Sequence, residues 1–599
     1  MHLRWSLVAP LLLMLAGCGG ESGGDADQAA ETTGASAQLH QLVEEYFEEG
    51  LKLNPLQATF IGDNRYNDQF ANSLGAEYRQ ANRNLHKSYL ERIDAIDPTT
   101  LEGQDRVIYE SFRWQREIAL EGFRYPSFLL PVNQFFSMPN RFALMGSGSN
   151  VQPFKTVEDY ENWLKRIDGF VVWMDQAIAN MREGAEQGIV QPRVLMERTL
   201  PQLANHLKGA PEETLFYRPV VNMPATIGEA DRERLTAAYI QAISNKVVPA
   251  YRRLHDFIRD EYLPLTRETV GLSDLPGGED WYAFLVRRTT STDLSPAEIH
   301  QIGLDEVTRI HGEMEKVITD VGFEGDLKTF FEFLNTDLQF YYTERDDLIN
   351  GYKAYREDIH PKALKIFYAL PKADYEIRAV EPFREKSASG GSYTAATPDG
   401  SRPGIFYANA YDLSARPKWA MESLFLHEAV PGHHFQGSIA REIESLPSFM
   451  RFGGITAYAE GWALYAESLG KEMGALQDPY QYFGVLNAEL WRAIRLVVDT
   501  GYHHHGWTRQ QVLDFMYENS AVKESRAVSE AERYIAIPSQ ALAYKIGQLK
   551  IRELRTRAEE QLGDAFDVKA FHQLVLDTGR LPLGVLEAKV DRWIAQQQN

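Results

Sequence analysis

An apolar stripe at helical spacing is the feature that most constrains the fold of this chain. Between residues 157 and 181, large apolar side chains recur at steps of three and four residues behind Thr156. A second stripe follows Ser295-Pro296-Ala297-Glu298, which is a capping box with proline at the first helical position. Segments with the alternating pattern of a strand are few. We therefore predict a mainly α fold with at most a small β-sheet.

The size and charge of the chain narrow its class further. Its 599 residues, 44% of them hydrophobic and 24% charged, are enough for a large core in a soluble globular protein. The formal net charge of −22 argues against a surface for nucleic acid or anionic lipid, because phosphate binding needs clustered lysine and arginine. A single cysteine excludes disulfide bonds within the chain. We expect one large domain or two coupled domains.

The first residues have the pattern of a processing signal. A short polar or basic start precedes an apolar run from Trp5 to Leu15, which is too short to span a bilayer. The segment Leu15-Ala16-Gly17-Cys18 resembles a bacterial lipobox, in which the cysteine is lipidated and becomes the new N-terminus. An ordinary secretory signal with an incidental cysteine is the alternative. We predict a lipoprotein signal peptide over residues 1–18, with lipidation at Cys18.

A flexible tether is expected after this cysteine. Residues 19–38 are rich in glycine, alanine, serine, aspartate and glutamate and have no aliphatic periodicity. The folded body should then extend over residues 39–599. Under the Gram-negative sorting rule that accompanies a lipobox, Gly19 favours the outer membrane because it is not aspartate. We expect an outer-membrane lipoprotein that faces the periplasm and contacts the membrane through its lipid anchor only.

Residues 424–436, LFLHEAVPGHHFQ, begin like the helix of a zinc peptidase and then depart from it. In the H-E-x-x-H pattern the second histidine follows the first by four residues, but Pro431 holds that position here. Proline removes a backbone donor and crowds the carbonyl four residues before it, so the helix must kink or bulge. A bulge of two residues at Pro431-Gly432 would bring His433 to the missing position. A bulge of three residues would bring His434 instead, and both possibilities stay open.

A third metal ligand is expected on a nearby helix, because catalytic zinc takes three protein ligands and leaves one position to water. Residues 457–467 have a helical pattern, and Glu460 lies in an apolar setting where its charge is costly to bury without a cation. Glu467 is either a partner of the metal site or a solvated residue on the same helix face. We predict one Zn²⁺ per chain, bound by His427, His433 and Glu460.

Glu428 and His434 have predicted roles beside these ligands. Glu428 can take a proton from water and pass it to a leaving amine. If His433 is the ligand, His434 would turn toward the substrate or pack behind the metal. The alternative to a metal site is a surface helix rich in histidine and glutamate.

One strand is expected just before the metal-site helix. Residues 404–409 follow a turn-rich segment over residues 398–403. Such a strand could pair with an extended peptide substrate, with Tyr407 as a contact residue, or it could belong to an internal hairpin. Both alternatives stay open.

Four motifs together resemble the bacterial family catalogued as domain of unknown function 885. They are H-E-A-V-P-G-H-H at residues 427–434, Y-A-E-G-W at 458–462, D-T-G-Y-H at 499–503 and S-R-P-G at 401–404. The resemblance spans most of the chain after the tether, with a metal-site portion at about residues 387–547. That family is similar in turn to helical gluzincin peptidases such as thimet oligopeptidase, Taq carboxypeptidase and angiotensin-converting enzyme. The resemblance implies a large helical zincin-like fold with a deep cleft.

The resemblance also implies residues that act on the substrate. Helical gluzincin peptidases stabilise the tetrahedral intermediate with histidine and tyrosine side chains from late in the chain, and His503 and Tyr544 are the candidates here. A polar loop for His503 and a core position for Tyr544 are the alternatives. A substrate carboxylate could be bound by Arg495, Arg533 and Lys545, unless these lie on solvated helix faces.

These features predict a zinc-dependent peptidase that hydrolyses short peptides in the periplasm. The restriction to short peptides follows from the family likeness, because a cleft under helices would exclude folded proteins. One alternative is a zinc amidase that acts on cell-wall peptides, and another is a non-catalytic lipoprotein that binds envelope partners. Glu428 favours catalysis, since a structural zinc does not need a free carboxylate beside it.

Overall fold

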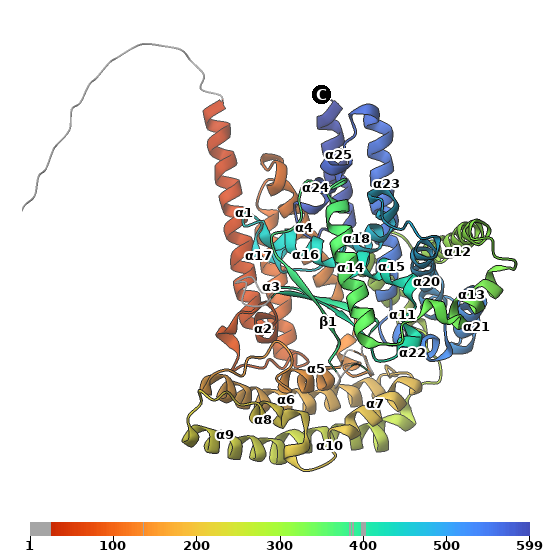
Figure 1. Cartoon of the computed structure of the whole chain (residues 1–599). Coiled ribbons are helices and arrows are strands. Elements are labelled where there is room, and N and C mark those ends of the chain that lie inside the picture. Colours follow the sequence, from red (N-terminus) through yellow and green to blue (C-terminus); the bar gives the residue numbers. More distant parts are fainter. Residues whose placement is uncertain (1–24, 136, 382–384, 386–388, 397–402, 599) are drawn as a thin grey trace, which may run out of the picture.

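The computed structural model of this chain describes residues 25–135, 137–381, 385, 389–396 and 403–598. Helices make up most of the described residues, and these hold one small sheet of three strands (Figure 1). The predicted mainly α fold is confirmed.

The helices of the N-terminal half are α1 (Asp25–Leu53), α2 (Pro55–Ile61), α3 (Ala76–Asp94), α4 (Gly103–Gly122), α5 (Met138–Gly146), α6 (Val157–Glu186), α7 (Arg193–Asn205), α8 (Arg218–Val221), α9 (Glu229–Ala242), α10 (Val248–Phe257), α11 (Gly278–Thr290) and α12 (Pro296–Asp320). Those of the C-terminal half are α13 (Leu327–Thr336), α14 (Arg345–Ala363), α15 (Met421–Glu428), α16 (His433–Glu442), α17 (Ser448–Arg451), α18 (Thr456–Ser468), α19 (Gly470–Met473), α20 (Pro479–His503), α21 (Arg509–Asn519), α22 (Glu524–Ala536), α23 (Ala543–Leu562), α24 (Val568–Leu576) and α25 (Leu583–Gln598).

Helices α6 and α12 begin directly after Thr156 and Ser295, the residues expected at their starts. The hydroxyl of Thr156 accepts a hydrogen bond from the backbone N–H of Asp159 at the start of α6. Ser295 does the same for Glu298 at the start of α12. In each case the acidic side chain bonds back to the N–H of the capping residue, so two free donors of the first turn are satisfied at once.

The buried apolar side chains form two cores that share α20. One core joins the N-terminal helices α1, α3 and α4 to the sheet and to α15, α18 and α23. The other contains α6, α9 and α10, which form the layer at the base of Figure 1, together with α12 and α22. Helix α20 gives Val485 and Leu496 to the first core and Leu490 and Ile494 to the second. It therefore joins the two parts of the molecule.

The sheet consists of β1 (Tyr375–Ala379), β2 (Gly391–Thr394) and β3 (Gly404–Ala408) in the order β1-β3-β2. Strand β3 pairs in parallel with β1 and antiparallel with β2. The strand predicted over residues 404–409 is thus present, but it is the central strand and is paired on both sides. A substrate peptide cannot add to it, and of the two alternatives only pairing within the protein holds.

One face of the sheet covers the helices of the predicted metal site. The ring of Phe406 in β3 lies 5.0 Å from that of Tyr352 in α14 and 6.3 Å from that of Phe425 in α15. Successive residues of a strand point to opposite faces. Tyr407 therefore points away from α15, and its contact with a substrate stays a prediction.

The N-terminal region differs in part from its prediction. The signal peptide, Cys18 and residues 19–24 of the predicted tether lie outside the described residues, whereas residues 25–38 form the first turns of α1. Figure 1 shows this end of α1 extending past its neighbours. Alanine, glutamate and glutamine in this stretch favour a helix once Leu39, Leu42 and Val43 anchor it in the core. No helix in the described part of the chain is long and apolar enough to cross a membrane.

Candidate metal centre

The predicted bulge at Pro431 is a break between two helices. Helix α15 ends at Glu428, α16 begins at His433, and the four residues between them are not helical. A Cβ atom at position 432 would collide with the carbonyl oxygen of His427, so only glycine allows the chain to turn back this closely. The carbonyl of Pro431 accepts a hydrogen bond of 2.8 Å from the indole N–H of Trp462 in α18. The broken segment is thereby tied to the helix that carries Glu460.

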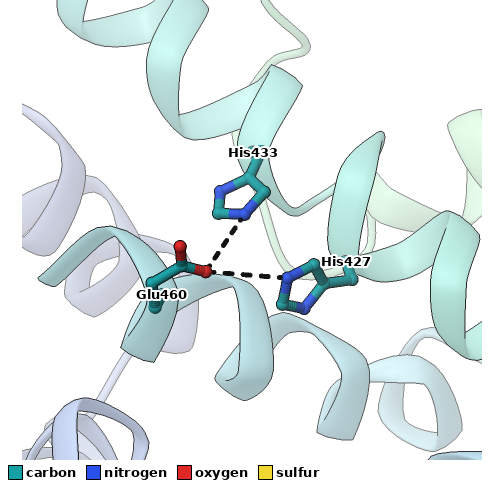
Figure 2. Close-up of side chains that lie close together, drawn as sticks. All are labelled: His427, His433 and Glu460. Atoms are coloured by element: carbon teal, nitrogen blue, oxygen red, sulfur yellow. Dashed lines mark ion pairs between the residues drawn. The ribbon is translucent and has the colours of Figure 1, made fainter. Parts of the chain in front are cut away.

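Three side chains converge across this break, as Figure 2 shows. Nε2 of His427 lies 3.8 Å from Oε2 of Glu460, and Nε2 of His433 lies 3.4 Å from the same oxygen. One donor atom from each residue lies within 4.8 Å of the others. The side chains of His433 and Glu460 are 19% and 20% exposed, so solvent reaches the group from their side.

The donor set suits zinc. Two imidazole nitrogens and one carboxylate oxygen are a common catalytic set for this ion. Nδ1 of His427 lies 2.8 Å from Oε1 of Glu467. When this carboxylate accepts the Nδ1 proton, Nε2 keeps its lone pair for a metal. Glu467 is fully buried and also accepts a hydrogen bond from Ser423, so it is the partner of the site and not a solvated residue.

The charges around this group also favour a bound cation. Burial lowers the pKa of His427 well below its ordinary value, which keeps the imidazole neutral. Burial alone would raise the pKa of Glu460, but the hydrogen bond from His433 and the charge of His433 outweigh it and hold this pKa at about 2. A neutral His427 and an ionised Glu460 are the protonation states that metal ligation requires. The pKa of His433 is raised, because the hydrogen bond and charge of Glu460 outweigh the effect of burial, so this ring gives up a proton when it binds a metal.

Glu428 is the buried carboxylate beside the three donors. It is the last residue of α15, is 9% exposed, and has no hydrogen bond or ion pair with another described residue. Burial raises its pKa to about 7, with the charge of His433 opposing the rise and that of Glu460 adding to it. A carboxylate with this pKa can both take and release a proton near neutral pH.

Tyr544 lies beside the same group. Its ring is 6.5 Å from that of His427 at an interplanar angle of 17°, and it comes from the first turn of α23. Helix α23 approaches α18 closely because Gly461 and Gly547 face each other there, and a side chain at either position would collide with the opposite backbone. This close packing brings Tyr544 to the metal centre.

His503 does not lie at the metal centre as a hydrogen-bond donor, contrary to the prediction. Its Nδ1 accepts a hydrogen bond of 2.9 Å from the backbone N–H of Leu272, and its Nε2 lies 3.0 Å from the carbonyl oxygen of Tyr534. Both nitrogens are therefore occupied, and burial lowers the pKa of the ring to about 3. The residue fixes two chain segments to the end of α20 and has no proton to offer an oxyanion.

His434 faces the sheet, so its predicted contact with substrate is wrong. It is 2% exposed, and its ring lies 4.3 Å from that of Tyr375 in β1. Its Nδ1 lies 2.9 Å from the hydroxyl of Tyr393 in β2. The side chain holds the sheet against α16 and is not part of the three-donor group.

Arg495 is already paired, which contradicts its predicted role as a carboxylate-binding residue. Its Nε donates to the hydroxyl of Tyr534 and its Nη2 to Oε2 of Glu530, both at 2.9 Å. Arg533 also contacts Glu530, at 3.3 Å. Lys545 is fully buried and lies 2.6 Å from Glu489.

Arg492 is a site residue that the sequence analysis missed. Its Nη2 lies 3.5 Å from Oε1 of Glu467, and its guanidinium carbon lies 5.9 Å from the centre of the Tyr544 ring. Its position three residues before Arg495 was the available signal, because residues at this spacing share a face when the segment is helical.

Comparisons with known proteins agree with this fold. A family model described as "Bacterial protein of unknown function (DUF885)" matches residues 55–590. The crystal structure described as that of "the putative lipoprotein from Colwellia psychrerythraea" is 30% identical in sequence, with a TM-score of 0.85. The alignment covers 94% of this chain and 99% of that one.

A second solved structure has the same fold at lower identity. It is described as "a putative lipoprotein of unknown function from Shewanella oneidensis", with 17% identity, a TM-score of 0.70, and coverage of 92% of this chain and 99% of that one. No curated protein matches the sequence.

Proposed function

We propose that this chain, which belongs to the DUF885 family of bacterial proteins of unknown function, is a zinc-dependent peptidase acting on short peptides. The observation that carries the proposal is the free, buried carboxylate of Glu428 beside a convergent set of three metal donors. A purely structural zinc needs four protein ligands and no such base. The likeness of the H-E motif to that of helical gluzincin peptidases supports the same reaction.

Each residue of the site has a separate role in the proposed hydrolysis. A zinc ion held by His427, His433 and Glu460 would polarise the scissile carbonyl and the attacking water. Glu428 accepts the proton of that water and delivers it to the amine nitrogen as the C–N bond breaks. Tyr544, beside His427, is positioned to donate a hydrogen bond to the oxygen that becomes negative.

We also propose that the protein is a lipoprotein of the outer membrane that faces the periplasm. The lipobox-like sequence that ends at Cys18 supports this, as does the description of both similar structures as those of putative lipoproteins. A periplasmic location would expose the enzyme to the short peptides released by protein and cell-wall turnover.

The test is the variant Glu428→Gln in the full chain. It keeps the size of the side chain and removes the proton acceptor, so hydrolysis of a mixed peptide library should fall by at least ~100-fold. Zinc content, measured by plasma mass spectrometry on dialysed protein, should equal that of the parent. Glu444→Gln changes an exposed glutamate in the same chemical way and should leave both quantities unchanged. Undiminished cleavage by Glu428→Gln would rule the mechanism out.

A further inference from the structure

Four arginines lie on the two helices next to the metal centre. Arg492 and Arg495 stand one turn apart on α20, and Arg526 and Arg533 stand two turns apart on α22. The guanidinium carbons of Arg492 and Arg495 lie 5.9 Å and 4.7 Å from the centre of the Tyr544 ring, and this ring lies 6.5 Å from that of His427. The cluster therefore adjoins the centre.

Carboxylates balance only part of this positive charge. Glu530 is shared between Arg495, at 2.9 Å, and Arg533, at 3.3 Å. Glu467 lies 3.5 Å from Arg492 but is also bonded to His427. The carboxylates that pair directly with these four arginines are thus fewer than the arginines, within a chain whose net charge is −22. A local excess of this sign attracts an anionic group of the substrate.

Arg526 is the arginine of this cluster whose guanidinium has no polar partner among the described residues. Among the described residues it forms no ion pair and no side-chain hydrogen bond, and its guanidinium carbon lies 5.2 Å from the centre of the Trp491 ring. Its side chain is exposed, so an anionic group in solution can reach its guanidinium.

Arg492 provides a second N–H donor in this cluster that has no partner among the described residues. Its Nε is buried and has no hydrogen-bond partner in the described part of the chain. Buried donors are nearly always paired, so an orphaned one beside a metal centre indicates a partner that the protein alone does not supply. Arg492 is the member of the cluster that contacts residues of the metal centre, because it lies against both Glu467 and Tyr544.

We propose that Arg526, together with Arg492, binds the C-terminal carboxylate of the peptide substrate. This inference rests on the proposed peptidase function and specifies its substrates as peptides with a free C-terminus. Guanidinium groups pair with carboxylates through two parallel hydrogen bonds, and stacking on Trp491 holds the group of Arg526 in one plane. Because the arginines stand at a fixed distance from the metal donors, the cut should fall at a fixed number of residues from the peptide's end.

The experiment compares two sets of the same six-residue peptides, one with a free C-terminal carboxylate and one amidated. The parent should cleave the free acids with a kcat/KM at least ~10-fold higher, which is the scale of one hydrogen bond to a charged group. Arg526→Gln should reduce kcat/KM for the free acids to the level of the amides, mainly through a higher KM. Arg526→Lys should recover part of the difference because it restores the charge without the planar fork.

Arg252→Gln is the matched control. It removes an exposed arginine from α10 and should behave as the parent with both peptide sets. A third set, in which aspartate and glutamate near the peptide's end are replaced by their amides, identifies the source of the carboxylate. If the preference follows these side chains instead of the terminus, the proposal is overturned.

Direct binding separates this inference from the proposed function. Fluorescence anisotropy with N-terminally labelled peptides on the Glu428→Gln protein measures affinity without turnover. Tight binding of the free acids alone, with no hydrolysis by the parent, would support the carboxylate site and refute the peptidase. Equal hydrolysis of both peptide sets by the parent would support the peptidase and refute the carboxylate site.

Discussion

His433 and His434 are adjacent in sequence but have different surroundings. Nε2 of His433 lies 3.4 Å from Glu460, within the three-donor group. His434 lies among the tyrosines of the sheet, and burial lowers its pKa to about 3. Successive residues of a helix are rotated by 100°, so two neighbours cannot both reach the same ion. The direction in which α16 starts after the break decides which histidine faces Glu460.

Alanine variants of His433 and His434 should therefore lose different properties, the first its bound zinc and the second its stability. His433→Ala should lose most of the bound zinc with little loss of stability, since its side chain is partly exposed. His434→Ala should keep zinc but lose ~1–3 kcal/mol of unfolding free energy, because the hydroxyl of Tyr393 loses its partner in a buried place. Plasma mass spectrometry and thermal unfolding measure the two effects. Loss of zinc only from His434→Ala would reverse the assignment.

The sequence predicted which three side chains converge, but not what surrounds them. The convergence of His427, His433 and Glu460 could be predicted because histidine and glutamate in an apolar setting have few other uses, and their binding of zinc stays a prediction. The role of His503 could not, because one of its partners is a backbone group 231 residues earlier in the chain. The pairing of Arg495 with Glu530 likewise depends on how α20 and α22 pack.

At the scale of elements, the break between α15 and α16 controls the site. Gly432 lies against the last turn of α15, where even a methyl group would meet the carbonyl oxygens of His427 and Leu426. The other end of the break is held by the hydrogen bond from Trp462 to Pro431. Any shift of this segment would rotate α16 and move His433 away from Glu460.

Gly432→Ala should therefore lose zinc and be strongly destabilised, by ~3 kcal/mol or more, as overpacked buried positions are. Gly312→Ala is the matched control, since it lies inside α12 with nothing within 4 Å of a new Cβ atom. Alanine there should be neutral or stabilise the fold by up to ~1 kcal/mol. Zinc content and chemical denaturation of both variants test the pair. Normal zinc content in Gly432→Ala would mean that the break accepts a Cβ atom at this position without moving His433, contrary to the prediction.

Elements with local signals could be predicted, and those that depend on distant contacts could not. The starts of α6 and α12 follow from capping boxes, which involve residues only three apart. The place of β3 at the centre of the sheet depends on β1, which lies about 30 residues earlier and pairs in parallel. The start of α1 extends into the predicted tether because the core that anchors this helix is built by α3, α4 and later segments.

At the scale of the whole molecule, α1 shares a core with the helices that carry the candidate metal donors. Leu39, Leu42 and Val43 are almost completely buried in the core that also contains α15 and α18. Glu44 accepts a hydrogen bond of 2.7 Å from the backbone N–H of Ser448 in α17, which follows α16 in the chain.

Two truncations separate the anchor from the fold. A chain that starts at residue 34 lacks Cys18 and keeps Leu39, Leu42 and Val43, so it should be soluble without detergent and unfold near the temperature of the full chain. A chain that starts at residue 50 also loses Leu39, Leu42 and Val43, whose burial contributes about 1.5–3 kcal/mol each. This loss is comparable to the whole stability of a typical domain, so the shorter chain should fail to fold. Membrane fractionation measures where each truncated chain is found, and thermal unfolding measures its stability. If the chain from residue 34 remains with the membrane, the body itself has a membrane-binding surface, and Cys18 is not the sole anchor.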